Sequence, residues 1–380
     1  MKRHVSHVTR DPLDMLLSDR MDRREFHKIL GALGLGFAAT TLGSSKAHAE
    51  EDANFFSWSG YELPEFHQGY IDKYGTGPKF SAFGGITEAM NKIRAGFKTD
   101  VAHPCAGEVT AWNAAGIIAP FDTSALKHWP DYFETLRTID HTLSPSGENL
   151  FVPWDWGNSS ILYRTDIVDL EGEEESWGIL FDERYKGKLA TYNSPQAGVQ
   201  TCAQVLGYTN LDRLTDAQLA EVRKLLVKQR GLLRFYWDSQ TEAGQAMVAG
   251  ELVATYAWND LYKTVSDEGL AVKFAVPKEG ARNWVCGLVL TAPESRVASD
   301  ERVYDFLDAM MSPEAGAYLI DAYSYGSSNS KAFDLVAPER VAEVGLSDPE
   351  AFLAKGLLKP IPAEFDQKYV ELWEEVRLGM

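Results

Sequence analysis

Five clusters of aromatic and polar residues each follow a short apolar segment of this sequence. They are Trp58-Ser59-Gly60-Tyr61, His103-Pro104-Cys105, Tyr192-Asn193-Ser194, Tyr236-Trp237-Asp238 and Trp258-Asn259-Asp260. The faces of Trp and Tyr rings attract cations, and carboxylates and amides accept hydrogen bonds from ammonium groups. A single aromatic residue more often belongs to a core, but five such clusters in one chain predict an aromatic-lined cleft with a few amides and carboxylates.

Short apolar segments alternate with helical segments along most of the chain. Strands are predicted at 54–58, 79–83, 99–104, 187–193, 232–237, 252–258, 272–277 and 284–292, and helices at 86–95, 108–115, 198–206, 216–229 and 242–249. Segment 148–164 is typical of two strands that meet at a turn. Further helices are expected at 300–311, 313–323, 349–354 and 363–378. This alternation predicts an α/β fold with largely parallel sheets, in which ligands bind at the carboxyl ends of strands.

The first fifty residues have the order of an export signal: a charged segment, an uncharged run and a small-x-small site. Arg23-Arg24, with Phe26 and Lys28, has the spacing of a twin-arginine signal, and cleavage is expected near Ala49. The uncharged run, 29–45, contains four glycines in 17 residues. A membrane anchor is less favoured, because a span needs about 20 apolar residues.

The expected mature chain is strongly acidic. Residues 1–49 contain eight basic and five acidic side chains, so their removal changes the net charge from -18 to -21. This charge disfavours nucleic acid and anionic membranes as partners and favours cationic solutes.

The three cysteines form neither a disulfide framework nor a Cys-x-x-Cys motif. A twin-arginine substrate folds before export in a reducing compartment, so Cys105, Cys202 and Cys286 are expected to be free thiols at first. A disulfide or a metal pair between Cys105 and Cys286 is a less favoured alternative.

Seven motifs follow one another between residues 54 and 379. They are FFSWSGYELPE, TDVAHP, LFVPWDWGNSSILYR, WGILFDERYKGKLATYNS, GQAMVAGELVATYAWND, VKFAVPKEGARNWVCGLVL and SPEAGAYLIDAYSYGSSNSKA. In this order they resemble the periplasmic substrate-binding proteins of polyamine-type ABC transporters, the spermidine and putrescine binders.

The resemblance implies a type II periplasmic binding protein of two lobes, each a mostly parallel sheet flanked by helices, with crossing strands as the hinge. It implies lobe 1 at 50–157 and 285–345, lobe 2 at 158–284, and C-terminal helices at 346–380 that pack across the lobes, after the export signal at 1–49. The implied partners are a cationic amine, a membrane permease and the twin-arginine export machinery.

The resemblance also implies an aromatic wall made of Trp58, Tyr61, Trp156, Trp258 and Trp284. The other candidate ligand-binding residues are Ser59, Cys105, Asn193, Asp238, Asp260 and Cys286. The chain departs from the family's pattern where an acid usually stands, because Cys286 lies two residues after Trp284 and Asn193 follows the strand of lobe 2. A polyamine is therefore the first expectation, and a smaller quaternary or zwitterionic amine, such as choline, betaine or γ-aminobutyrate, is the alternative.

Two other classes of function are less favoured. The mature sequence contains no G-x-S-x-G, H-E-x-x-H or phosphate-loop motif, which disfavours an enzyme without excluding one. Tyr323 and Tyr325 suggest a ferric-ion binder, but nearby His and acidic ligands are missing from the sequence. We expect no cofactor and no metal.

Overall fold

The computed structural model describes residues 52–379 except 292–300, 344, 347 and 355–358. The predicted export signal, with Arg23, Arg24 and Ala49, lies outside these residues. Among the described residues, none of the helices combines the length and the apolar character that a membrane crossing requires.

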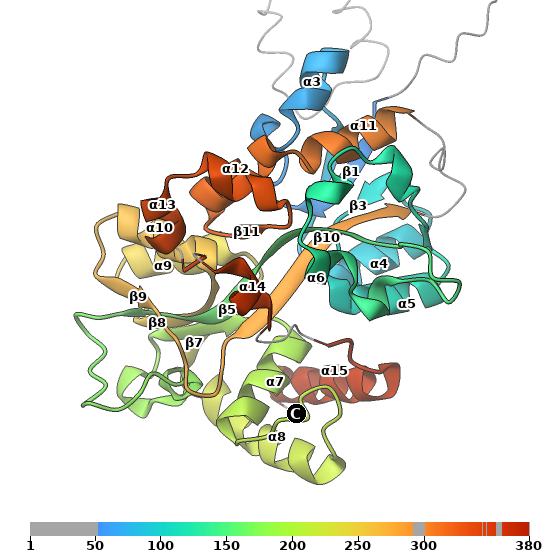
Figure 1. Ribbon diagram of the computed structural model, residues 1–380. Coiled ribbons are helices and arrows are strands. Elements are labelled where there is room, and N and C mark those ends of the chain that lie inside the picture. The colour runs from blue at the N-terminus through green and yellow to red at the C-terminus, as the bar shows by residue number, and fades with distance from the viewer. Residues whose placement is uncertain (1–51, 292–300, 344, 347, 355–358, 380) are drawn as a thin grey trace, which may run out of the picture. The chain divides into compact units, whose positions relative to one another are not determined.

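The strands of the described residues form one mixed sheet (Figure 1). Its main order is β2-β1-β3-β10-β5-β8-β6-β7, with β4, β9 and β11 paired at its sides. The bounds are β1 Asn54–Trp58, β2 Lys79–Phe83, β3 Val101–Ala102, β4 Ile118–Ala119, β5 Val152–Arg164, β6 Leu189–Tyr192, β7 Leu233–Trp237, β8 Ala254–Trp258, β9 Val272–Phe274, β10 Arg282–Thr291 and β11 Gly326–Ser327.

Parallel pairing occurs in two separate groups of strands. In the first strand group β1 pairs with β2 and β3, and in the second β6 pairs with β7 and β8. The antiparallel strands β10 and β5 connect the two groups, because β10 pairs with β3 and β5 pairs with β8. The predicted α/β architecture with crossing strands is therefore confirmed.

Strand β5 corrects the prediction of two strands that meet at a turn in segment 148–164. It runs without interruption for 13 residues, with β10 and β8 as partners along its length. Gly157, within this strand, allows a close approach of neighbouring side chains. A Cβ atom at this position would lie 2.7 Å from Oδ1 of Asn259 and 2.9 Å from the Trp284 ring.

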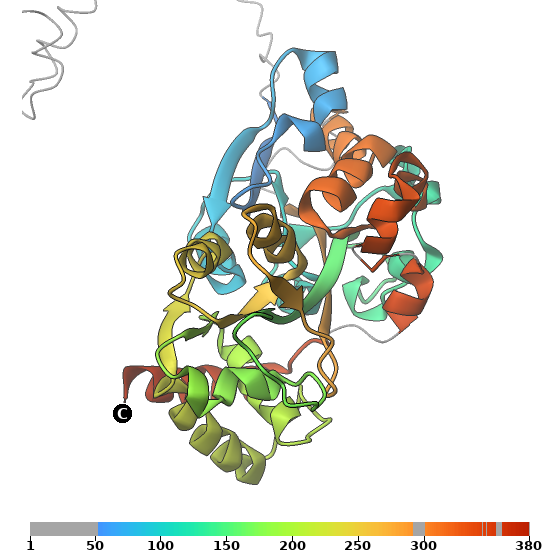
Figure 2. The same ribbon diagram turned by 90° about the vertical axis from the view of Figure 1, so that its left-hand side faces the viewer.

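Helices flank both strand groups, as Figures 1 and 2 show. The α-helices are α3 Gln68–Tyr74, α4 Ile86–Arg94, α5 Val109–Ala114, α6 Glu134–Arg137, α7 Pro195–Val205, α8 Asp216–Arg230, α9 Gln240–Val248, α10 Asn259–Asp267, α11 Glu301–Met310, α12 Pro313–Tyr323, α13 Pro338–Glu343, α14 Pro349–Ala354 and α15 Ala363–Leu378. The predicted helices are present, and α10 is among those that were not predicted. Helix α7 begins three residues before its predicted start, because Ser194 caps it and Pro195 suits its first turn.

Three hydrophobic clusters fill the described part of the chain. Phe55 and Phe56 of β1 belong to different clusters, as expected for neighbouring strand residues that point to opposite faces. The third cluster lies around the second strand group and includes Trp373 of α15. A Cβ atom on Gly198 of α7 would lie 1.9 Å from the Trp373 ring, so a glycine is required where α15 packs on α7.

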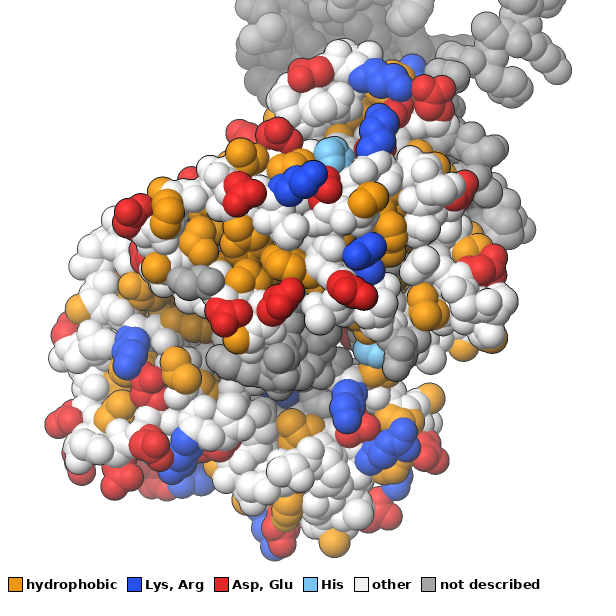
Figure 3. All heavy atoms as spheres, in the orientation of Figure 1, with side chains coloured by type: hydrophobic (Ala, Val, Ile, Leu, Met, Phe, Trp, Pro, Cys, Tyr) orange, Lys and Arg blue, Asp and Glu red, His pale blue; other side chains and the backbone are white. Residues whose placement is uncertain are grey.

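The surface in Figure 3 carries acidic, basic and apolar side chains interspersed with one another. Much of its acidity is offset locally, since ion pairs such as Arg184 with Asp182 and Lys331 with Asp131 are common among the described residues. Exposed pairs of this kind contribute little to stability, about 0–1 kcal/mol each.

Candidate functional site

Three predicted aromatic residues gather where the strands of the second group end. Tyr192, Trp237 and Trp258 are the last residues of β6, β7 and β8. The ring centroid of Tyr192 lies 4.7 Å from that of Trp237 and 5.3 Å from that of Trp258. Because parallel strands end at the same edge of a sheet, the sequence clusters that follow them meet there.

Trp58, at the end of β1, brings the first strand group to the same place. Its ring centroid lies 6.4 Å from that of Trp258, with the two rings inclined at 66°. Both side chains are partly exposed. The two strand groups therefore present their terminal tryptophans to each other.

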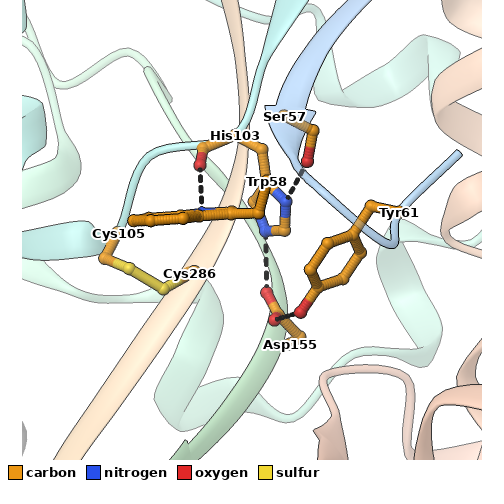
Figure 4. The surroundings of a disulfide bond; sticks show 7 residues. All are labelled: Ser57, Trp58, Tyr61, His103, Cys105, Asp155 and Cys286. Carbon is orange, nitrogen blue, oxygen red and sulfur yellow. Dashed lines mark hydrogen bonds and ion pairs between the residues drawn. A yellow bond between two sulfur atoms is a disulfide. The ribbon is translucent and has the colours of Figure 1, made fainter. Parts of the chain in front are cut away.

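A buried hydrogen-bond network holds the first strand group's side of the site (Figure 4). The Tyr61 hydroxyl donates to Oδ2 of Asp155 over 2.7 Å, and Oδ1 of Asp155 lies 2.8 Å from Nε2 of His103. Nδ1 of His103 lies 2.9 Å from the Ser57 hydroxyl. The Trp58 indole donates to the backbone carbonyl of His103 over 3.1 Å, so His103 fixes the positions of both Tyr61 and Trp58.

Tyr61 acts only as a hydrogen-bond donor in this network. Burial, and then the neighbouring Asp155 carboxylate, hold the pKa of the Tyr61 hydroxyl well above its usual value. The ring is buried and packs against Tyr323 and Phe66, at centroid distances of 5.7 and 5.5 Å. Tyr61 is therefore a buried member of the network that also holds Trp58, and exposed Ser59 lies in the turn between these two residues.

Cys105 and Cys286 are joined by a disulfide bond across 181 residues of sequence. This pairing corrects the expectation of free thiols for these two residues and leaves only Cys202, which is buried, free among the three. The bond ties the loop after β3 to strand β10, directly opposite Asp155 in the ladder. It lies next to the network of Tyr61, Asp155 and His103 (Figure 4).

Asp260, in the first turn of α10, is the central carboxylate of the site. Its Oδ1 accepts hydrogen bonds from the Tyr325 hydroxyl over 2.7 Å and from the Gln240 amide over 2.6 Å. The same Gln240 side chain accepts from the backbone N–H of Trp258 over 2.6 Å. Burial raises the pKa of Asp260, and the two neutral donors only partly oppose that effect.

Tyr325 connects Asp260 with the rest of the aromatic wall. It packs in the same core cluster as Phe55 of β1, whereas Asp260 follows the last strand of the second group. Its ring meets Trp284 edge-on at a centroid distance of 5.0 Å. The sequence reasoning did not place Tyr325 or Gln240 here, because neither Asp260 contact is local in sequence.

Trp156 does not join the other predicted aromatic residues. Register pairs Gly157 with Trp284 and Trp156 with Val285, so Trp156 points to the opposite face of the sheet. Its ring is fully buried against Phe333 and Phe352. The placement of Trp156 in an aromatic wall is therefore not supported by this geometry.

Asn193 and Asp238 lie together at the ends of β6 and β7. The Asn193 amide donates to Oδ1 of Asp238 over 2.9 Å and accepts from the Trp373 indole over 3.2 Å. Asn193 therefore bridges Asp238 and helix α15, and Asp238 remains exposed.

Glu108 is an acidic residue that the sequence reasoning missed. Its Oε2 is inaccessible to solvent and has no hydrogen-bond partner among the described residues. Burial, and then the Asp366 carboxylate of α15, raise the pKa of Glu108 to about 7. The only feature of the sequence that could have indicated a place for Glu108 near the site was its position three residues after Cys105.

The geometry does not suit a ferric ion at Tyr323 and Tyr325. The Tyr323 hydroxyl donates to the Gly60 carbonyl over 2.6 Å, and the Tyr325 hydroxyl donates to Asp260. Burial raises the pKa of both hydroxyls, which opposes the tyrosinate form that would bind iron. No group of three or more His, Cys, Asp or Glu side chains suited to a metal occurs in the described part of the chain.

The crossing strands, the meeting of two strand groups and the aromatic side chains at their ends define the class of protein. Residues 73–348 match the family described as bacterial extracellular solute-binding protein, and the chain belongs to this family.

Similar individual proteins cover almost the whole chain. The putrescine-binding periplasmic protein PotF of Escherichia coli is 24% identical over 367 residues, which cover 92% of this chain and 97% of that protein. The spermidine/putrescine-binding periplasmic protein of Salmonella typhimurium is 22% identical over 356 residues, covering 91% and 97%. The structure of a putative spermidine/putrescine ABC transporter from Listeria monocytogenes superposes with a TM-score of 0.76 at 18% identity, over 86% of this chain and 99% of that one.

Proposed function

We propose that this chain is the periplasmic substrate-binding component of an ABC importer and that it captures a polyamine or a similar cationic amine. The observation that carries the proposal is that Trp58 and Trp258 meet beside the partly buried carboxylate of Asp260. The names of the two curated relatives, which refer to putrescine and spermidine, support this class of ligand.

The chemistry of the site favours a cation. A cation over the face of Trp or Tyr gains about 0.5–2 kcal/mol, depending on its desolvation. Asp260 accepts hydrogen bonds only from neutral groups in the described structure, so its charge lacks a cationic partner there. An ammonium group would provide that charge and would strengthen the hydrogen bonds at this carboxylate.

The proposal includes two lobes that close on the ligand. The expected lobe boundaries, 157/158 and 284/285, fall at Gly157 and Trp284, which are paired directly in the ladder of β5 and β10. The hydrogen bond between Tyr325 and Asp260 and the contact between Trp58 and Trp258 would then link lobe 1 to lobe 2. Membership of a solute-binding family supports transport rather than catalysis as the role of this closure.

A panel of amines tests the proposal by thermal unfolding. Putrescine, spermidine, choline, glycine betaine, γ-aminobutyrate and Fe(III) are each titrated, and at least one amine is expected to raise the melting temperature with the logarithm of its concentration. Binding at 1,000 times Kd stabilises a native state by about 4 kcal/mol. Small-angle scattering should show compaction with the same amine. A panel without any stabilising amine would contradict the proposed function, and stabilisation by iron alone would replace it.

We extend the proposal to the route of export, in which Arg23 and Arg24 direct the precursor to the twin-arginine machinery and cleavage follows near Ala49. Replacing both arginines with lysine is expected to leave the precursor in the cytoplasm, as measured by cell fractionation. A matched change of Arg10 and Arg20 to lysine should leave export intact. Normal periplasmic yield of the Arg23 and Arg24 variant would refute this route.

A further inference from the structure

Arg282, the first residue of β10, is a buried cation without an acidic partner. Its side chain is 4% exposed. Nη2 donates to Oε1 of Gln200 over 2.5 Å, while Nε and Nη1 have no hydrogen-bond partner among the described residues. Burial lowers the pKa of the guanidinium, and the Tyr256 hydroxyl is the neighbour that opposes this change. No carboxylate in the described structure forms an ion pair with it.

The ladder register places Arg282 on the same face of the sheet as the candidate site. Arg282 is opposite Ser159 of β5, and Ser159 is opposite Trp258 of β8. Residues directly opposite in antiparallel strands point to the same face. Arg282 and Trp258 therefore flank the small side chain of Ser159 from either side.

The same face continues along β10 toward the other aromatic residues. Trp284 lies two residues after Arg282, so its side chain points to the same side of the strand. Its ring packs over Gly157 of β5 and against Tyr325, which bonds Asp260. One face of the sheet thus carries the unpaired cation of Arg282. Tyr325, which packs against Trp284 on this face, bonds the carboxylate of Asp260, which lacks a cationic partner.

An arginine in such a position calls for an anion. A buried charge is tolerated when it is paired and hydrogen-bonded, and unpaired donors of a guanidinium match the two oxygens of a carboxylate. A polyamine would bring only positive charge next to Arg282, which would repel it. An amine that also carries a carboxylate would satisfy Asp260 and Arg282 at the same time.

We propose that the amine ligand bears a carboxylate group and that Arg282 is the residue that binds it. This inference rests on the proposed function and narrows its substrate class to amino-carboxylates. Arg282 thereby sets specificity, while the aromatic side chains and Asp260 hold the ammonium end.

Matched ligands test the inference. Putrescine and 5-aminopentanoate differ only in the group at one end of a four-methylene chain, an ammonium or a carboxylate. By isothermal titration calorimetry, 5-aminopentanoate is expected to bind at least ten times more tightly than putrescine. Glycine betaine is compared in the same way with choline, and γ-aminobutyrate with 1,3-diaminopropane. These two pairs allow for a different ligand length.

Arg282→Gln provides the matching test on the protein. It is expected to weaken binding of the preferred amino-carboxylate at least tenfold and to leave any diamine unaffected or tighter. Arg234→Gln is the control, because Arg234 is also in a strand but pairs with Glu251 at the surface. If Arg282→Gln fails to fold, Arg282→Lys keeps the charge and should retain the preference, with weaker binding than the parent.

The outcomes separate this inference from the proposed function. If a diamine or choline binds at least as tightly as the matched ligand that carries a carboxylate, the proposed role of Arg282 is wrong. The proposed function as an amine-binding protein would still stand. A preference for carboxylates that persists in Arg282→Gln also overturns it. If no amine of either kind binds, both proposals fail.

Discussion

Replacing Asp260 with asparagine is expected to weaken binding of the amine by about 30-fold to more than 1,000-fold. Removal of one member of a buried, hydrogen-bonded charge pair costs about 2–5 kcal/mol of binding free energy. Asparagine has the same shape as aspartate, and its side-chain oxygen can still accept hydrogen bonds from Gln240 and Tyr325. The substitution therefore removes only the negative charge. Calorimetric titration with the best ligand of the panel measures it.

Asp267→Asn is the matched control for this variant. Asp267 ends the same helix, is exposed and pairs with Lys263. Its replacement should leave the affinity within a factor of about two, as is usual for surface substitutions. If Asp260→Asn and the parent protein bind the amine with similar affinities, Asp260 does not bind the ligand.

The raised pKa of Asp260 gives the same prediction a pH dependence. A carboxyl whose pKa is raised by folding contributes stability at low pH that is lost as the pH rises through the folded value. Without ligand, Asp260→Asn should therefore be more stable than the parent protein at neutral pH. A bound ammonium favours the ionised carboxylate, so affinity should fall on acidification below the raised pKa, and this fall should be absent from Asp260→Asn.

Removal of the disulfide between Cys105 and Cys286 is expected to lower the free energy of unfolding by about 2–5 kcal/mol. The bond closes a loop of 181 residues, and a long loop restricts the unfolded chain strongly. For a domain of this size the loss corresponds to a decrease of about 3–7 °C in melting temperature. Scanning calorimetry of the double variant Cys105→Ser and Cys286→Ser measures it.

Two controls accompany the disulfide variant. Treatment of the parent protein with a reductant should give the same decrease, whereas the double variant should not respond to it. Cys202→Ala, at the free cysteine, should not change the response of the protein to reductant. If reductant leaves the parent melting temperature unchanged, the disulfide does not stabilise the native protein.

The sequence predicted the fold well because its signals are local. Alternation of apolar strands with capped helices required no knowledge of distant contacts, and helix α8 occurs almost as predicted. Helix α10 was missed because Trp258, Asn259 and Asp260 indicated a site and no capping side chain marked a helix start.

The site was predicted only in part, because its geometry depends on register and on distant pairs. Trp58 and Trp258 follow strands directly, and strand order alone brings them together. The direction of Trp156 depends on the alternation within β5, in which a shift of one residue reverses the face. The partners of Asp260 and Cys286 come from segments far away in sequence, which no local pattern reveals.

The crossing strands also determine the order in which the chain can complete its structure. Strand β10 is synthesised after the whole second strand group, yet it supplies the ladder partner of β3 in the first. The segment 158–284 contains β6, β7 and β8 without interruption, whereas the first group waits for residues 289 and 290 to emerge from the ribosome. The first strand group, although it is synthesised first, is thus the second to acquire its full set of β-sheet hydrogen bonds.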